Sequence, residues 1–154
     1  MTVHIIDCDA APFCHHGWGI EEHRKDGQIV WDATRVQLHC SGEQKGGRIK
    51  GHALREELKN RPVLNANVLD YLLKNPYLIP DDWKGKRVFF WGTIYRNPEG
   101  FLYVRSLCWK DGKMDGYWRW GYYHLNWKDG KWKERSCSLD DDLSDQSPAA
   151  MLCA

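Results

Sequence analysis

Residues 86–136 alternate aromatic-rich runs with turn-forming steps, and this pattern constrains the fold more than any other part of the chain. Four of these runs have the β-branched and aromatic composition of strands: residues 86–95, 101–109, 117–127 and 131–136. Asn97-Pro98-Glu99-Gly100 has the composition of a turn, and the Asp-Gly steps at 111–112 and 129–130 are typical of tight hairpins. The pattern predicts an antiparallel meander of about four strands in the C-terminal half.

The residues before this meander have helical periodicity. Leu54 and Leu58 lie four positions apart ahead of Pro62, which indicates a first helix. Asn65 is a good N-cap for a second helix running through Lys74, and its apolar stripe consists of Val68, Leu69, Leu72 and Leu73. Short strands are predicted at 3–6, 28–31 and 35–40. We therefore expect an α+β fold in which two or three short helices pack on the meander.

The length of 154 residues is typical of a single domain. The last residues differ in composition, because four aspartates and no Lys or Arg follow position 139: Asp140, Asp141, Asp142 and Asp145. We therefore expect one domain at 1–138 and an acidic, mobile tail at 139–154.

A local excess of positive charge coincides with the aromatic residues. The chain has a net charge of only +1, but residues 84–135 carry twelve Lys or Arg against five Asp or Glu. The same segment holds fourteen aromatic residues, and six of the nine tryptophans lie at or after position 91. Basic and aromatic residues together are typical of surfaces that bind single-stranded nucleic acid.

The predicted strand at 117–127 would carry this surface, because alternate residues of a strand share a face. An open aromatic face beside positive charge predicts binding of single-stranded nucleic acid through Arg105, Trp118, Arg119, Trp120, Tyr122 and Lys128. The alternative is that these rings only pair across strands inside the core. A second possible partner is another protein chain, and we expect no binding to a membrane.

A group of Cys and His residues near the N-terminus gives a rival hypothesis, a metal-binding protein or an enzyme. Five potential zinc ligands lie within sixteen residues: Cys8, Cys14, His15, His16 and His23. Their spacing matches no familiar zinc knuckle, so a loop with buried thiols and solvated histidines is the competing interpretation. We expect no cofactor, with zinc as the alternative.

Asp7-Cys8-Asp9 after a short apolar strand resembles the nucleophile motif of haloacid-dehalogenase phosphatases. The resemblance ends after Asp9, and an antiparallel meander does not supply the parallel sheet that such an enzyme uses. No Gly-rich phosphate loop has the required spacing either. We therefore favour a binding domain over an enzyme.

The chain shows neither an apolar run of about 18–20 residues nor a basic, apolar leader, so we expect a cytoplasmic protein with reduced cysteines. Several stretches resemble a group of small bacterial proteins of unknown function: residues 62–73, 79–85 and 90–96, together with Ile6-Asp7-Cys8-Asp9-Ala10 and Glu21-Glu22-His23. The resemblance implies a prokaryotic cytosolic origin and carries over no functional residue.

Overall fold

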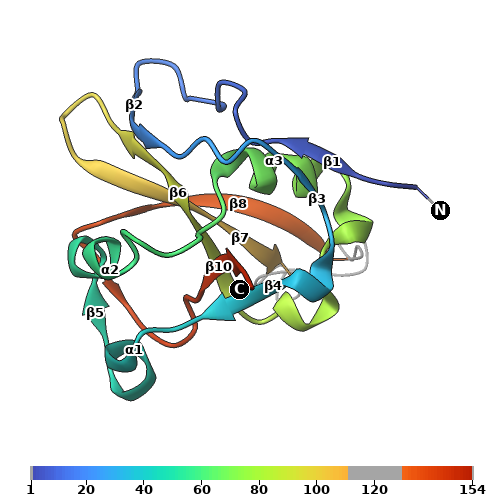
Figure 1. Cartoon of the computed structure of the whole chain (residues 1–154). Helices are drawn as coiled ribbons and strands as arrows, with labels where there is room; N and C mark the ends of the chain where they lie inside the picture. The colour runs from blue at the N-terminus through green and yellow to red at the C-terminus, as the bar shows by residue number, and fades with distance from the viewer. Residues whose placement is uncertain (1, 111–129, 154) are drawn as a thin grey trace, which may run out of the picture.

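The computed structural model describes residues 2–110 and 130–153 and builds them around a central sheet (Figure 1). Its strands are β1 (Ile5–Asp7), β2 (Gly19–His23), β3 (Gln28–Val30), β4 (Val36–His39), β5 (Ile49–Lys50), β6 (Arg87–Arg96), β7 (Leu102–Lys110), β8 (Lys131–Ser138), β9 (Asp142–Leu143) and β10 (Ala149–Leu152). Its α-helices are α1 (Gly42–Gly46), α2 (Gly51–Glu57) and α3 (Ala66–Lys74). Short 3₁₀ turns span Ala33–Arg35, Pro76–Leu78 and Asp81–Trp83.

The central sheet has the order β4-β10-β6-β7-β8. β7 pairs antiparallel with β6 and with β8, whereas β10 is parallel to β6 and antiparallel to β4. β2 also pairs with β6, beside the half of that strand that β10 leaves free. The expected α+β class is therefore confirmed, but the sheet is mixed and not purely antiparallel.

The C-terminal meander is confirmed for the strands that the structure describes. The predicted runs 86–95, 101–109 and 131–136 correspond to β6, β7 and β8. β8 pairs with β7 along its whole length, from Lys110 opposite Lys131 to Tyr103 opposite Ser138. The predicted strand at 117–127 lies outside the described residues.

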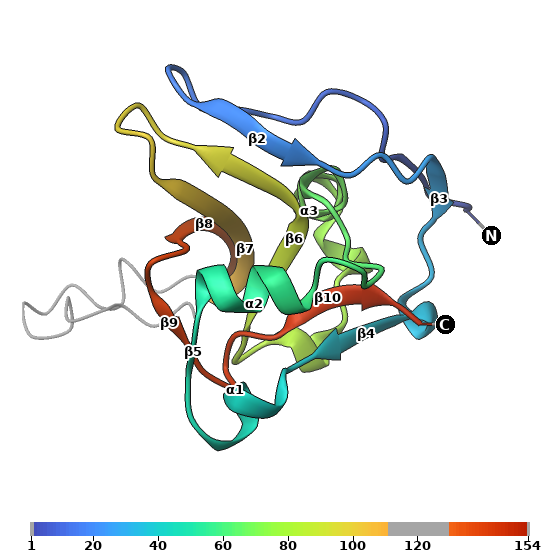
Figure 2. The same ribbon diagram turned by 60° about the vertical axis from the view of Figure 1, so that its left-hand side comes forward.

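Both faces of the sheet are covered, by α3 on one side and by α2 with β5 and β9 on the other (Figure 2). Alternate residues of β6 divide between the two sides, as the pleat of a strand requires. Val88 and Phe90 pack with the helix α3, and Phe89 and Trp91 pack with Leu54 of α2 and its neighbours. The described part of the sheet is therefore a double-sided core.

Helix α3 forms where the sequence predicts it. Asn65 caps its N-terminus by accepting a hydrogen bond from the Asn67 N–H, and Asn75-Pro76 ends it. Val68, Leu69 and Leu72 are fully buried against the sheet. The opposite face of α3 is turned toward the N-terminal segment. No helix within residues 2–110 and 130–153 is long and apolar enough to cross a membrane.

The expected tail is instead part of the domain. β10 is inserted between β4 and β6, and Ala149, Ala150 and Met151 are buried. Leu139 and Leu143 are buried as well, while the aspartates between them point to solvent. The acidic composition of the segment reflects its exposed positions, and its apolar residues supply the contacts that hold it in place.

Candidate functional site

Of the six residues predicted to bind nucleic acid, the structure describes only Arg105. Trp118, Arg119, Trp120, Tyr122 and Lys128 lie outside the described residues. The prediction that Arg105 offers a positive charge at an open face is wrong. Its side chain is only 3% exposed, on the α3 side of β7.

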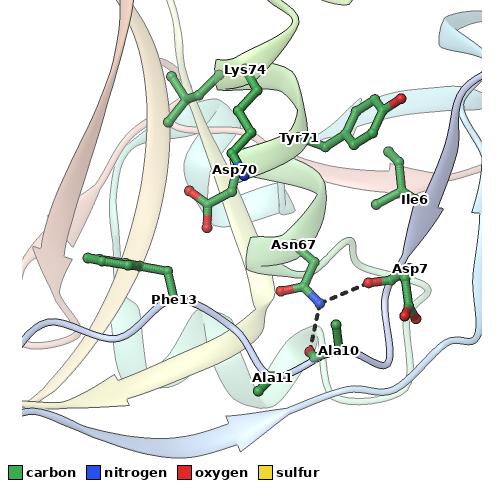
Figure 3. A pocket seen from close by; sticks show the side chains of 10 residues that line it. Ile6, Asp7, Ala10, Ala11, Phe13, Asn67, Asp70, Tyr71 and Lys74 are labelled. Carbon is green, nitrogen blue, oxygen red and sulfur yellow. Dashed lines mark hydrogen bonds between the residues drawn. The ribbon is translucent and has the colours of Figure 1, made fainter.

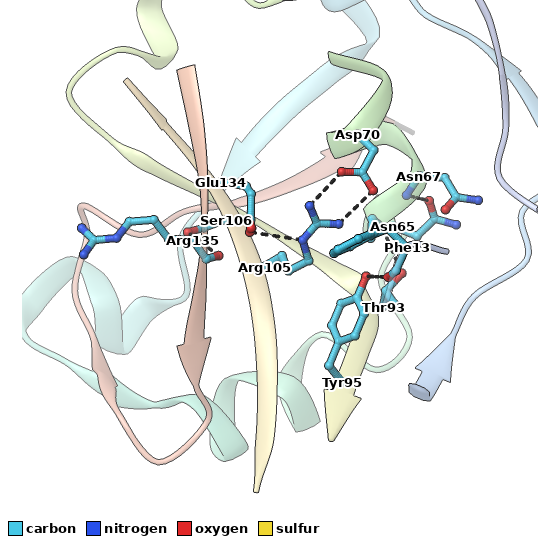
Figure 4. Close-up of polar contacts among 11 residues, drawn as sticks. Phe13, Asn65, Asn67, Asp70, Thr93, Tyr95, Arg105, Ser106, Glu134 and Arg135 are labelled. Atoms are coloured by element: carbon cyan, nitrogen blue, oxygen red, sulfur yellow. Dashed lines mark hydrogen bonds and ion pairs between the residues drawn. The ribbon is translucent and has the colours of Figure 1, made fainter. Parts of the chain in front are cut away.

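Arg105 is instead the centre of a buried ionic cluster, which we define as Arg105, Asp70 and Glu134 (Figure 4). Its two Nη atoms donate to the Asp70 carboxylate at 2.9 and 2.7 Å, and its Nε donates to Glu134 at 3.3 Å. Burial alone would lower the pKa of Arg105, but the hydrogen bonds to Asp70 and its charge outweigh burial and raise the pKa above its usual range. The guanidinium is therefore bound to two carboxylates and is not available to bind a phosphate group of a nucleic acid.

The proposed zinc ligands do not come together in the described residues. Burial first, then the charges of Asp26, Asp7 and Asp9, raise the pKa of Cys8 to about 11. The ring of His15 makes edge contacts with Phe13 and Trp18, at centroid distances of 5.0 and 5.3 Å, while Cys14 is half-buried and His16 is exposed. Across residues 2–110 and 130–153, no three His, Cys, Asp or Glu side chains gather as a metal site.

His23 has a clear structural role. Its Nε2 lies 3.1 Å from the Cys8 carbonyl oxygen, which can only accept, so Nε2 carries the proton. Its Nδ1 then accepts from the hydroxyl of Thr93 at 2.8 Å, and that hydroxyl accepts from the Ala66 N–H. Both ring nitrogens are therefore used to join the N-terminal segment to β6 and α3.

The Asp-x-Asp pair also serves the backbone. One oxygen of Asp7 accepts from the Asp9 N–H at 3.0 Å, and one of Asp9 accepts from the Gly27 N–H at 2.9 Å. These contacts close the turn between β1 and the loop that precedes β3. Neither the parallel sheet nor a metal cluster that would accompany a phosphatase motif occurs around them in the described part of the chain.

An aromatic cleft lies at the far end of β7 and β8. Trp109 faces Trp132 across the two strands, with ring centroids 5.3 Å apart at an angle of 66°. The ammonium of Lys84 lies 4.0 Å from the centre of the Trp109 ring, a cation–π contact. Together with Tyr77, which is 74% exposed, these side chains border a cleft of about 420 Å³. We call it the aromatic cleft.

The contact of Trp109 with Gly130 explains why the cleft needs a glycine at that position. A Cβ atom at position 130 would overlap the indole of Trp109. Any other residue would therefore require the indole of Trp109 to shift from its place in the cleft. The Asp-Gly step that signalled a turn in the sequence therefore also shapes the cleft.

Positive charges follow β8 away from this cleft. Trp132 and Glu134 point to the α3 side, so Lys131, Lys133 and Arg135 point to the other face. Arg87 of β6 shares that face, because it stands opposite Cys108, which stands opposite Lys133. In the part of the chain that the structure describes, no carboxylate pairs with Arg87, Lys131 or Arg135. We call Lys131, Lys133, Arg135 and Arg87 the basic strip.

The sequence contains a signal for both features. Lys131-Trp132-Lys133-Glu134-Arg135 alternates basic with other residues at the period of a strand, which assigns the cations to one face. Trp109 and Trp132 belong to the aromatic excess of the C-terminal half, but residues 131–135 carry only one ring and are a weaker aromatic signal than residues 117–127.

Comparisons with known proteins do not place the chain in a family. No family model matches it, and no curated protein or solved structure is significantly similar to it. The resemblance to small bacterial proteins and the origin that it implies therefore stay predictions. The function has to be inferred from the residues themselves.

Proposed function

We propose that this chain is a non-enzymatic binding domain whose ligand is single-stranded nucleic acid, held at the aromatic cleft and the basic strip. The observation that carries the proposal is the position of Trp109 and Trp132, paired and half-buried on the α3 side where β8, the last strand of the described sheet order, begins. Lys131 of the basic strip also lines this cleft, so a strand that stacks on the rings can pass over the edge of β8 to the cations on the other face. Bases stack on such rings with little regard to sequence, at about 1–3 kcal/mol for each base.

The spacing of the basic strip supports a polyanionic ligand. Residues two apart on a strand are separated by roughly 6.7 Å along it, so Lys131, Lys133 and Arg135 form a regular row. Lys131 and Arg135 have no carboxylate partner among residues 2–110 and 130–153, and cations of this kind favour a partner that brings repeated negative charge. The buried cluster of Arg105 fixes the strands that carry the row and takes no part in binding.

Lys84 fits the same ligand. Its ammonium covers the Trp109 ring, and its ion pair with Asp81 is solvent-exposed, at 3.4 Å. Surface pairs of this kind contribute little to stability, so the side chain can swing from the ring to a phosphate when a base takes its place. The free protein would then hold the ring surface covered until ligand arrives.

Fluorescence anisotropy with labelled twelve-nucleotide dT and rU strands tests the proposal. We expect saturable binding at 50 mM salt, with log K falling against log salt by about 0.7 for each phosphate that is neutralised. A Lys131→Glu/Arg135→Glu variant should bind at least tenfold more weakly and with a shallower salt slope. Trp109→Leu should weaken binding by about five- to a hundredfold through lost stacking.

The matched control is Lys45→Glu/Arg48→Glu, which changes the net charge equally at exposed residues in and after α1. Its affinity should be reduced far less than that of the variant in the basic strip. Absence of salt-sensitive binding to either strand at 50 mM, or equal losses in the two double variants, would overturn the proposal.

A further inference from the structure

A second cavity, of about 440 Å³, lies between α3 and the N-terminal segment (Figure 3). Its volume is within the range of small-molecule pockets, about 300–1,000 Å³. The helix presents residues 67, 70, 71 and 74 to it, the face opposite to the buried stripe of α3. The apolar part of the lining is Ile6, Ala10, Ala11, Phe13, Tyr71 and Leu73.

The amide of Asn67 presents an acceptor to this cavity. Its Nδ2 donates to the carbonyl oxygens of Asp7 and Ala10, at 3.0 and 2.8 Å. Because carbonyl oxygens can only accept, the orientation of the amide is fixed and its Oδ1 is turned away from both. Figure 3 shows this oxygen on the side of Phe13 and Asp70.

Negative charge dominates the polar lining. Asp70 balances Arg105, but Glu134 is bound to the same guanidinium, so the ionic cluster has a net charge of −1. The Asp70 side chain lines the cavity and is 28% exposed, and its carboxylate oxygens keep acceptor capacity after accepting from Arg105. Asp7 adds a second carboxylate at the rim, and Lys74 is the opposing cation in the lining.

Aromatic rings complete the cavity. Phe13 is 51% exposed although it is a phenyl group, and the guanidinium of Arg105 lies 5.3 Å from its ring centre on the inner side. Tyr71 is fixed by a hydrogen bond of 2.8 Å between its hydroxyl and His4. Ring faces attract cations, and the apolar area of Phe13 is available for a ligand to cover.

We propose that this cavity binds an organic cation, an ammonium or guanidinium group carried on an apolar body. The charged group would donate to Asp70 and to the Oδ1 of Asn67, the apolar body would lie against Phe13 and Tyr71, and Asp7 would add negative charge to the lining without contacting the ligand. A neutral or anionic ligand of the same shape would leave these acceptors without donors. The site is separate from the aromatic cleft and selects the opposite charge, so the failure of one proposal leaves the other standing.

Isothermal titration calorimetry with phenethylamine and benzamidine tests the site, with phenethyl alcohol as the neutral counterpart. We expect saturable binding of both cations and at least tenfold weaker binding of the alcohol. Asp7→Asn keeps the acceptor for the Asp9 N–H and should lower the affinity for both cations by about two- to fivefold. Lys74→Met removes a positive charge from the lining and should raise that affinity by a similar factor. A capped lysine or arginine dipeptide distinguishes a peptide side chain from a free amine, and binding of either kind supports the cation chemistry.

Lys59→Met is the matched control, because Lys59 is an exposed lysine outside the cavity. It should leave the affinity for phenethylamine unchanged. Equal affinity for amine and alcohol, no heat at millimolar ligand, or a change in Lys59→Met as large as that in Lys74→Met would overturn the proposal. Circular dichroism of each variant shows that the fold is intact before binding is compared.

Discussion

Arg105 was predicted to bind a ligand, but its positive charge stabilises the fold instead. It lies on β7 between Val104 and Ser106, in a strand whose residues are largely buried. A buried guanidinium is tolerated only with acceptors for its donors, and Asp70 of α3 and Glu134 of β8 supply them. The cluster therefore joins the helix to two strands.

The two sides of this cluster should respond differently to substitution. Asp70→Asn removes the partner of a guanidinium that cannot reach water, and we expect a loss of about 3 kcal/mol in the free energy of unfolding. Arg105→Leu leaves Asp70 and Glu134, whose side chains are 28% and 27% exposed and can turn to solvent, so its cost should be smaller. Urea unfolding measures both, with the exposed Asp82→Asn as control. A larger cost for Arg105→Leu would contradict the assignment.

Two buried thiols make stability depend on pH in the alkaline range. Burial first, and the aspartates around Cys8 second, raise its pKa from 9.0 to about 11. Burial, and then the hydrogen bond and charge of Asp141, do the same to Cys137. The unfolded chain loses these protons near pH 9.0, where the folded protein still holds them.

Stability should therefore be fully present below pH 9 and fall as the pH rises toward 11. In that window the unfolded state binds fewer protons than the folded state, so ionisation favours unfolding. Urea midpoints at pH 8 and pH 10 measure the fall. Cys8→Ala and Cys137→Ala should each flatten it, while Cys153→Ala, which removes an exposed thiol, should not. A pH dependence unchanged in the double variant Cys8→Ala/Cys137→Ala would refute this origin.

At the scale of elements, helical periodicity predicted α3, and β-branched and aromatic runs between turn-forming steps predicted β6, β7 and β8, because both signals lie within the element itself. The Asn65 cap was predicted for the same reason. Its second role was not, since its Nδ2 donates to the carbonyls of Cys8 and Arg24, which are 57 and 41 residues away. No local pattern contains such partners, and the cavity beside α3 depends on them.

This second role can be separated from the cap. Aspartate caps helices as well as asparagine does, but its carboxylate has no donor for the two carbonyls. Asn65→Asp should therefore lower the free energy of unfolding by about 2–4 kcal/mol, from two lost hydrogen bonds and the repulsion between oxygens. Thermal or urea unfolding gives the value, and Asn60→Asp at an exposed position is the control. A near-neutral Asn65→Asp would mean that the cap alone matters.

At the scale of the molecule, the C-terminal segment closes the sheet. The Phe89 N–H donates to Pro148, the Leu64 N–H to Ala150, and the Leu152 N–H to Pro62, so the segment is bonded on both sides. The sequence suggested a tail because four aspartates and no Lys or Arg follow position 139. Only the position of β10 beside two strands distant in sequence shows which of these residues decide the fold.

A chain ending at Ser138 should therefore fail to fold cooperatively. The loss of residues 139–154 would leave the facing edges of β4 and β6 unpaired and would open the core around Phe89 and Trp91. This cost is comparable with the whole stability of a domain, about 5–15 kcal/mol. Circular dichroism with urea unfolding would show a broad or absent transition. A chain ending at Leu152 keeps β10 and should unfold like the full chain. If the shorter chain unfolded with a native-like midpoint, β10 would be an appendage, and the domain would end where its acidic segment begins.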